Sequence, residues 1–413
     1  MKSIYFCFPY KGVGGVSVLF VRVAEFLASS GMAKCYLIDY EDGHMSKIKD
    51  SKLTELIPYS ESQTIKIPDN VIVIFQSMTP WSIFPNLKFG NRTKFIFWNC
   101  HPLNLIPSIP GFRNLTATSS FLSKLIMNSL LLVYKIRVRN FLLFLHKRHS
   151  IFFMDGNNLD VTCDMLSLKI LEPKFLPIPA NNKKQIYWKY DNSNDSDFLN
   201  FLWLGRVVDF KYFPLKRFLK DLNDSDVVSN SKVRITIVGK GDYHTNLKED
   251  VELNNNFQIR YIDHIDLNKL DEFIIKNASI VVAMGTSALE SAKLGVPTLV
   301  LNFSYKEIEG SYDYYWLHET KEYNLGKLIG ANDTLVSNST LSEKIIEFQN
   351  SAKEISSRDL NYFKKNHDLA MVSKKLFHYS DIANCYLNDM SDKGFLKKSY
   401  IYRVFRNLRS LRS

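Results

Sequence analysis

The sequence predicts an α/β protein made of two similar domains, each with a parallel sheet covered by helices on both faces. Two observations point to this class. Short, continuously apolar segments alternate with amphipathic segments along the chain, which is typical of buried parallel strands joined by helices. The alternation stops at a polar stretch, residues 181–197, and then begins again. With 413 residues, the chain is also long enough for two domains of about 150–200 residues each.

The first domain is expected to span residues 1–180. Its strands are expected at 3–9, 34–38, 70–75 and 94–98, and its helices at 17–30 and 121–147. The first of these helices carries Leu19, Val23, Phe26 and Leu27 on one face, and Gly31 is a suitable residue to end it.

The second domain is expected to span residues 198–385. Residues 181–197 are expected to form a linker, because the run 191–197 contains no apolar residue that could join a core. Strands are expected at 198–204, 232–238, 257–261, 279–283 and 298–302, and a helix from Ser287. A basic segment, residues 386–413, closes the chain.

The composition, with 46% apolar and 23% charged residues, is that of an ordinary globular protein. It excludes a collagen-like chain, a coiled coil and wholesale disorder. The five cysteines lie far apart and form no C-x-x-C pair, so neither a zinc site nor a disulfide framework is predicted. The N-terminus has no signal-peptide pattern. We therefore expect a cytoplasmic protein.

The net charge of +11 is concentrated in two places. Residues 70–154 contain ten lysines and arginines and no acidic residue, and residues 393–412 contain seven more cations. Such a field attracts polyanions, which means nucleic acid or an anionic bilayer. Zinc-finger, basic-zipper and RNP-type patterns, which would indicate nucleic-acid binding, are absent from the sequence.

A glycine-rich loop follows the first expected strand. Gly12 and Gly14 fit part of a dinucleotide-binding fingerprint, with Ser17 in place of its third glycine and Asp39 at the end of the next strand. This partial match leaves three alternatives open. The loop could bind a dinucleotide, it could be a simple turn, or Gly14 and Gly15 could let a phosphate or sugar approach the helix N-terminus.

Arg206 and Lys211 follow the strand expected at 198–204, where open α/β sheets bind ligands. A guanidinium and an ammonium together could neutralise a diphosphate leaving group. The alternative is a pair of solvated surface cations.

The segment 285–290 begins a helix with Gly285, Thr286 and Ser287, which offer backbone N–H groups and hydroxyls to an anion. Ser287 and Glu290 also have the spacing of a capping box, which taken alone is the favoured interpretation.

These segments, in this order, resemble the family 4 glycosyltransferases, whose GT-B fold has two Rossmann-like domains facing each other across a cleft. The resemblance is carried by Gly14-Gly15, by 205–211, by the glycine loop 238–242 that includes Gly239, and by 285–297. It implies that Arg206 and Lys211 bind the donor diphosphate and that Glu290 holds the ribose.

The resemblance assigns further positions of the donor site. Gly285, Thr286 and Ser287 would meet the phosphates, and the base would lie against 261–264, at Ile262. His101, which ends the strand 94–98, would sit beside the donor sugar. One departure is Val282, which stands where many members of the family have a second glutamate that faces that sugar.

The function implied is a retaining glycosyltransferase that moves a sugar from a nucleotide sugar to a lipid-linked saccharide in surface polysaccharide synthesis. No metal or other cofactor is expected, because the two Asp-x-Asp matches, 195–197 and 224–226, lie in linker-like and turn-rich stretches. A nucleotide-sugar epimerase of the same architecture and a nucleic-acid-binding protein are the alternatives.

Residues 121–148 mix apolar and basic side chains without an acid, and their longest uncharged run, 125–134, is too short to span a bilayer. This pattern predicts an element that lies in the interface of an anionic membrane, so the enzyme is expected to be peripheral on the inner face of the cell membrane. The alternative is a core helix with a solvated basic edge.

Overall fold

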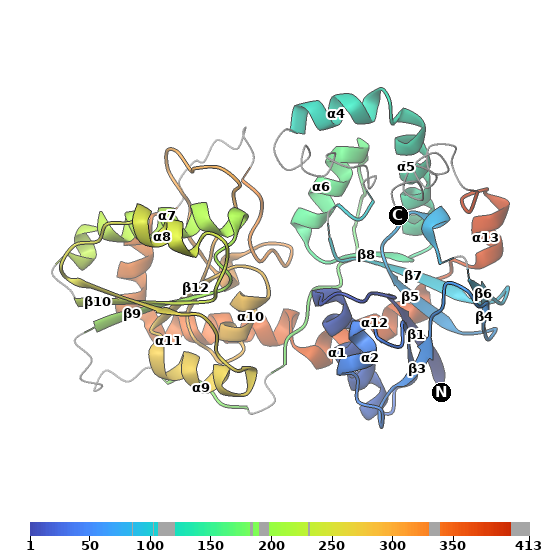
Figure 1. The fold of residues 1–413 in the computed structure, drawn as a ribbon, viewed down its shortest axis with the longest axis horizontal. Helices are drawn as coiled ribbons and strands as arrows, with labels where there is room; N and C mark the ends of the chain where they lie inside the picture. The colour runs from blue at the N-terminus through green and yellow to red at the C-terminus, as the bar shows by residue number, and fades with distance from the viewer. Residues whose placement is uncertain are drawn as a thin grey trace. The chain divides into compact units, whose positions relative to one another are not determined.

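The structure is a computed structural model that describes residues 1–84, 86–101, 103–105, 120–181, 185–189, 198–229, 232–329 and 339–397. The chain forms two compact units (Figure 1). The first unit combines Met1–Ile178 with the chain from Leu369 onward, and the second is Pro179–Asp368.

The second unit ends earlier than the sequence predicted. Residues 369–385 were expected in the second domain, but they belong to the first unit. The reason is the helix α12 (Leu369–Ile382), whose Leu369, Val372 and Leu376 are buried in the same apolar cluster as Ile4 and Phe6 of the first strand. Most of the expected linker, 182–184 and 190–197, and the end of the basic segment, 398–413, lie outside the described residues.

The first unit contains a parallel six-stranded sheet with the order β3-β2-β1-β5-β7-β8. Its strands are β1 (Lys2–Cys7), β2 (Ala33–Asp39), β3 (Glu55–Pro58), β5 (Ile72–Gln76), β7 (Lys94–Asn99) and β8 (Ile151–Phe153). Its helices are α1 (Gly15–Ser29), α2 (His44–Ile48), α4 (Ser120–Asn128), α5 (Leu132–Lys147), α6 (Gly156–Leu166), α12 and α13 (Leu387–Asp392), with the short helix η1 (Pro80–Ser82). The strands β4 (Ile65–Ile67) and β6 (Leu87–Phe89) form a separate parallel pair.

Both faces of this sheet are buried, as the continuous apolar strands predicted. Alternate residues of each strand point to opposite faces. Ile96 and Trp98 of β7 join α1 and α12 in one apolar cluster, whereas Phe95 and Phe97 join α4, α5 and α6 in another. The two helix layers are visible on either side of the sheet in Figure 1.

The second unit repeats this plan with the sheet order β11-β10-β9-β12-β13-β14, in which only β14 is antiparallel. Its strands are β9 (Phe198–Leu204), β10 (Lys232–Val238), β11 (Phe257–Ile262), β12 (Ile280–Ala283), β13 (Thr298–Val300) and β14 (Tyr315–Trp316). Its helices are α7 (Asp209–Asn223), α8 (His244–Asp250), α9 (Leu267–Asn277), α10 (Thr286–Ala292) and α11 (Leu341–Asn366), with the short helices η2 (Asp226–Val228) and η3 (Leu317–Glu319).

The expected α/β class is therefore confirmed, and each strand predicted from the sequence is present with its ends shifted by at most two residues. The single helix expected at 121–147 is two helices, α4 and α5, separated by a turn at 129–131. The α10 helix begins at Thr286, one residue before the predicted start.

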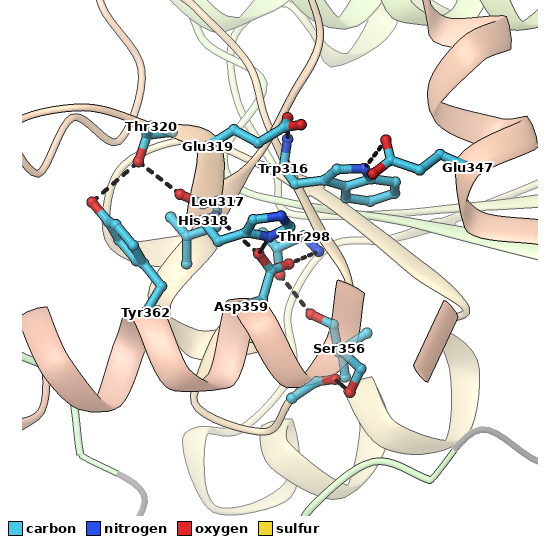
Figure 2. A network of polar contacts seen from close by, with 12 residues as sticks. Thr298, Trp316, Leu317, His318, Glu319, Thr320, Glu347, Ser356, Asp359 and Tyr362 are labelled. Carbon is cyan, nitrogen blue, oxygen red and sulfur yellow. Dashed lines mark hydrogen bonds and ion pairs between the residues drawn. The ribbon is translucent and has the colours of Figure 1, made fainter. Parts of the chain in front are cut away.

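A buried carboxylate ties α11 to the sheet of the second unit (Figure 2). Asp359, which is fully buried, accepts hydrogen bonds from the backbone N–H of Thr298 at 2.8 Å, from that of His318 at 3.0 Å and from the His318 ring at 2.7 Å. Burial raises the pKa of Asp359 although these donors oppose it. The carboxylate thus joins α11 to β13 and η3 through three donors that would otherwise be unpaired.

Asp359→Asn is expected to destabilise the second unit by about 1–3 kcal/mol, because an amide nitrogen would face an N–H donor and leave it unpaired. Urea unfolding measures the change. The control is Glu354→Gln in the same helix, which alters an exposed ion pair with Arg358 and should leave the midpoint unchanged. Equal midpoints for wild type and Asp359→Asn would show that this network does not stabilise the unit.

Candidate functional site

The strand register of the second unit brings the predicted donor-site segments to one edge of the sheet. Leu204 is paired with Val238 and with Ala283, and Val238 is also paired with Ile262. These four residues are the last residues of β9, β10, β11 and β12. The loops that follow, at 205–208, 239–241, 263–266 and 284–285, therefore leave the sheet together at its carboxyl edge.

The connection order places a ligand site at this edge. The chain runs from β9 to β10 and β11 on one side and then crosses to β12 on the other side of β9. In open α/β sheets, ligands bind at such a switch point, outside the carboxyl ends of the strands. Arg206 follows β9 and Gly285 follows β12, so the segments predicted at 205–211 and 285–290 flank this point.

Two glycines let the loops after β9 and β10 pack against each other. Gly239 has a φ of +127°, and a Cβ at this position would lie 2.4 Å from the carbonyl oxygen of Gly205. Gly205 has a φ of +152°, and a Cβ there would lie 3.0 Å from Lys211 Nζ. Glycine at these positions therefore keeps the 205–206 backbone and the Lys211 ammonium close together.

Arg206 and Lys211 form a pair of cations without a counterion. Arg206 is exposed and Lys211, in the first turn of α7, is half-buried. Among the described residues, no carboxylate lies within ion-pair distance of either side chain. Burial and the neighbouring Arg206 charge lower the pKa of Lys211 to about 8. This arrangement is unfavourable for the empty protein and suits an anionic ligand.

The capping box favoured for Ser287 and Glu290 is not formed. The residue that caps α10 is Gly285, with a φ of +64°, and no side chain caps the helix. Ser287 and Glu290 both lie inside the helix. Glu290 accepts a hydrogen bond from Lys293 Nζ at 2.5 Å. The helix begins one residue earlier than predicted, so the spacing no longer matches that of a cap.

Lys293 holds Glu290 in a defined position. Lys293 is 6% exposed, and its ammonium group also pairs with Asp271 of α9 at 2.9 Å. Only Oε2 of Glu290 is used by Lys293, and the other oxygen accepts no hydrogen bond from the described residues. Glu290 thus retains one acceptor atom, while Thr286 is exposed and Ser287 half-buried beside it at the start of α10.

The positions that the resemblance placed around base and sugar differ in accessibility. Ile262 ends β11 and is half-buried at the carboxyl edge. Val282 is fully buried and paired with Trp203 and Leu299 in the middle of the sheet. Val282 therefore contributes to the core and presents no polar group to the candidate site.

In the first unit, Gly14 precedes α1 and Gly15 begins it, and no side chain caps this helix. A Cβ at Gly15 would meet nothing within 4 Å, so the backbone here is open on that side. Asp39, the acid of the partial dinucleotide fingerprint, is fully buried. Its carboxylate accepts the backbone N–H groups of Tyr10 at 2.8 Å, Tyr40 at 2.9 Å and Met45 at 2.8 Å. These bonds occupy the group that would hold a ribose, which disfavours dinucleotide binding.

His101 lies where it was predicted, on the loop that follows β7. Its side chain is exposed, and Nδ1 accepts a hydrogen bond from the backbone N–H of Leu103 at 3.1 Å. This bond places the proton of the neutral ring on Nε2.

A group of buried polar residues near His101 was missed from the sequence. Asn99 ends β7, and Asn158 in α6 donates to its carbonyl at 3.1 Å. Asn99 Oδ1, Asn158 Oδ1 and Ser77 Oγ are buried and have no hydrogen-bond partner among the described residues. Asp155 caps α6 by accepting the N–H of Asn158 at 2.7 Å, and burial raises its pKa to about 6. The sequence signal for this group was the polar run 155–158, which follows the buried strand β8 almost directly.

No cluster of three metal-ligating side chains occurs within the part of the chain that the structure describes. Of the two Asp-x-Asp matches, 195–197 lies outside the described residues, and 224–226 lies at the end of α7 and the start of η2. That place precedes β10 and therefore lies towards the edge of the sheet opposite the strand ends that form the candidate site.

No protein-family model and no curated protein matches this sequence. Solved structures do match, over 92% of the chain. A glycosyltransferase from Rickettsia africae ESF-5 is 16% identical, with a TM-score of 0.54 over 98% of its length. The lipopolysaccharide outer core galactosyltransferase WaaB in its apo form is 11% identical, with a TM-score of 0.50 over 99% of its length. Anabaena Alr3699/HepE in complex with UDP-glucose is 9% identical, with a TM-score of 0.51 over 100% of its length. The chain has the GT-B fold.

Lys211→Met is expected to stabilise the empty protein at pH 7. Because the pKa of Lys211 is lowered to about 8, the folded protein loses this proton at a lower pH than the unfolded chain, whose lysine titrates near 10.5. The charged lysine therefore costs stability below pH 8, on the order of 3 kcal/mol, and the cost disappears as the pH rises towards 10.5.

Urea unfolding at pH 7 and pH 10 measures this difference. Lys220→Met, on the exposed side of the same helix, is the control and should show a difference from wild type that does not depend on pH. A Lys211→Met protein that is less stable than wild type at both pH values would contradict the electrostatic description of the site.

Proposed function

We propose that the protein is a glycosyltransferase that binds a nucleotide sugar in the second unit. The observation that carries this proposal is the pair of uncompensated cations, Arg206 and Lys211, at the switch point of the sheet. The diphosphate of a nucleotide sugar supplies the missing negative charge. HepE, which shares the fold, was solved with UDP-glucose bound, which supports a ligand of the same class here.

The two cations would act on the leaving group. When the bond between the anomeric carbon and the diphosphate breaks, its electron pair stays on the diphosphate oxygen. Arg206 and Lys211 would stabilise that charge at the moment it develops. Because Lys211 has a low pKa in the empty site, the arriving diphosphate would raise it and keep the ammonium charged at neutral pH.

The rest of the reaction needs no strong protein base. The acceptor hydroxyl forms the new bond to the anomeric carbon on the face that the diphosphate leaves, and its proton passes to the departing diphosphate. The product would keep the anomeric configuration of the donor. This proposal agrees with Val282, which supplies no carboxylate to the site.

The remaining predicted residues would orient the donor. Glu290, held by Lys293, would use its free oxygen to accept a hydrogen bond from the ribose. Ser287 and Thr286 would contact the phosphates, and Ile262 the base. His101, with its proton on Nε2, would donate to a hydroxyl of the sugar.

The first unit would take the acceptor, which we propose to be a lipid-linked saccharide in surface polysaccharide synthesis. The unpartnered oxygens of Asn99, Asn158 and Ser77 support a polar ligand at the carboxyl edge of its sheet, since buried acceptors without donors are costly. Hydroxyl groups of a saccharide are donors of the required kind. The exposed apolar side chains of α4 and α5 support the lipid part.

The activity is tested by incubating the protein with a panel of nucleotide sugars, with and without a bacterial lipid extract, in the presence of EDTA. We expect release of the nucleoside diphosphate that depends on the extract, and a product with the donor's anomeric configuration. EDTA should have no effect, because the two cations provide the charge that a metal ion would otherwise supply.

Other outcomes of this assay identify the alternatives. Conversion of the nucleotide sugar without any acceptor would show an epimerase. Loss of turnover in EDTA, restored by manganese or magnesium, would contradict metal independence. A salt-sensitive mobility shift with RNA or DNA, together with no nucleotide-sugar binding, would show a nucleic-acid-binding protein.

Arg206→Ala is expected to weaken the binding of UDP by roughly 10- to 150-fold, because a charge-assisted hydrogen bond contributes about 1.5–3 kcal/mol. Calorimetric titration with UDP measures the change, and Arg358→Ala, an exposed arginine on α11, is the control. Equal UDP affinities for wild type and Arg206→Ala would show that the diphosphate does not bind at Arg206.

Glu290→Gln separates a ligand-binding role from a structural one in the same titration. Lys293 keeps its pair with Asp271 in this variant, so unfolding should change little while UDP binding weakens. A loss of stability with unchanged affinity would mean that Glu290 only holds α10 in place.

A further inference from the structure

Exposed apolar side chains gather on one short stretch of the first unit. Of the 18 large apolar residues that are exposed among the described residues, seven lie within residues 121–136. We call this group the 121–136 patch; its members are Phe121, Leu122 and Leu125 of α4, Leu130 in the following turn, and Leu132, Val133 and Ile136 of α5. Leu130 is 79% exposed, Phe121 74% and Val133 67%.

Each helix buries one polar residue beside apolar ones, such as Met127 of α4 and Val138 of α5, and exposes the apolar side chains of the patch. Ser123 of α4 is fully buried. Lys135 of α5 is 7% exposed, and its ammonium group donates to Asn128 Oδ1 and, at 2.7 Å, to Ser167 Oγ. On a helix at a water-facing surface, polar residues are expected on the outer face. These inward hydrogen bonds hold the orientation, so the exposure of the patch is built into the packing.

The patch occupies only the first half of the element that the sequence predicted to lie in a membrane. Phe141, Leu142 and Leu145 of α5 were included in that element, but they are fully buried in the core of the unit. For this second half, the alternative of a core helix is correct. The reason is that α5 packs these side chains into the core against β7 and β8, whereas Leu132, Val133 and Ile136 lie on the exposed face of its first turns.

Fewer basic residues of the 121–148 region face solvent than the sequence suggested. Lys135 is buried, and the Arg137 guanidinium stacks on Trp81 at 4.5 Å. Arg139 is exposed one turn after Ile136, and Lys124 lies between Leu122 and Leu125 with an ion pair to Asp164 at 2.7 Å. The patch contains no acidic residue, nor does the whole stretch 70–154.

We propose that the 121–136 patch docks onto an anionic lipid bilayer, with its apolar side chains inserted at the boundary between headgroups and acyl chains. The charge of the surroundings favours this partner, because Arg139 and Lys124 flank an uncharged apolar surface, and Asp164, which pairs with Lys124, is the acid that the ion pairs of the described residues place beside it. Figure 1 shows α4 at the outer edge of the first unit, where it is accessible to such a surface. This inference goes beyond the proposed function and does not depend on the donor site.

The geometry fits a protein that lies on the bilayer. No helix among the described residues is both long enough and apolar enough to cross a membrane. The nine residues of α4, the turn and the first turns of α5 could instead bury several large side chains to a shallow depth. The apolar contacts would supply most of the affinity, and Arg139 and Lys124 would add a preference for anionic lipid.

The test is co-sedimentation of the full chain with phosphatidylcholine vesicles and with vesicles that also contain phosphatidylglycerol. The triple variant Phe121→Ser, Leu130→Ser, Val133→Ser removes the most exposed members of the patch, and it should bind the anionic vesicles at least roughly 50-fold more weakly than wild type. Wild type should prefer anionic vesicles, and the preference should shrink at high salt.

The control is the double variant Leu171→Ser, Leu267→Ser. Leu171 is 67% exposed and Leu267 79%, which matches Val133 and Leu130, but neither belongs to the patch. This variant should bind vesicles as wild type does. All of the substituted side chains are exposed, so we expect both variants to unfold at the wild-type temperature and to bind UDP as wild type does. The first measurement shows that each variant is folded, and the second shows that its donor site is intact.

Several results would overturn the proposal. They are equal binding of wild type and the triple variant, equal binding to neutral and anionic vesicles at low salt, or no vesicle binding at all. A change from dimer to monomer in the triple variant, seen by light scattering without a change in vesicle binding, would assign the patch to a contact between two copies of the chain. Failure of the wild-type protein to bind UDP would contradict the proposed function but would not affect the inference about the 121–136 patch.

Discussion

Arg206 and Lys211 keep two positive charges close together at the end of β9, with no described carboxylate to balance them. The repulsion and the burial of the ammonium group lower the pKa of Lys211 to about 8, which is a cost to the empty protein. The surrounding structure maintains this arrangement through Gly205 and Gly239, whose missing side chains let two loops meet. An anion with two negatively charged groups would remove the cost, so the site is organised for a ligand that is not part of the chain.

The rest of the second unit positions the loops and helices around these two charges. The in-register ends of β9, β10, β11 and β12 bring four loops to one edge of the sheet. Lys293 and Asp271 hold Glu290 on the neighbouring helix, and Asp359 ties the long helix α11 to β13 on another side. The fold alone does not determine a function. The chemistry of this edge is the link between the GT-B fold of this chain and the diphosphate ligand that we propose.

Much of this could be predicted from the sequence because the signals are local. Continuous apolar runs predicted the strands of both sheets except the short strands β3, β8 and β14, and glycine next to a strand end marked the loops at Gly205, Gly239 and Gly285. The assignment of Leu369–Ile382 to the first unit could not be predicted, because it depends on contacts with α1, far away along the chain. The burial of Lys135 in α5, beside exposed apolar residues, depends on its partners Asn128 and Ser167, and no periodicity of the sequence reveals it. The capping box at Ser287 and Glu290 failed because a shift of one residue in the helix start changes which side chain can reach the first turn.

The claim on which the account depends is that a diphosphate binds against Lys211. Titration of the protein with UDP at pH 8, in buffers of different ionisation enthalpy, measures how many protons are taken up on binding. Lys211 is about half-protonated at this pH in the empty site, and it should become fully protonated beside the diphosphate. We therefore predict an uptake of about half a proton in wild type and none in Lys211→Gln. Tight binding of UDP without proton uptake in wild type would contradict the account.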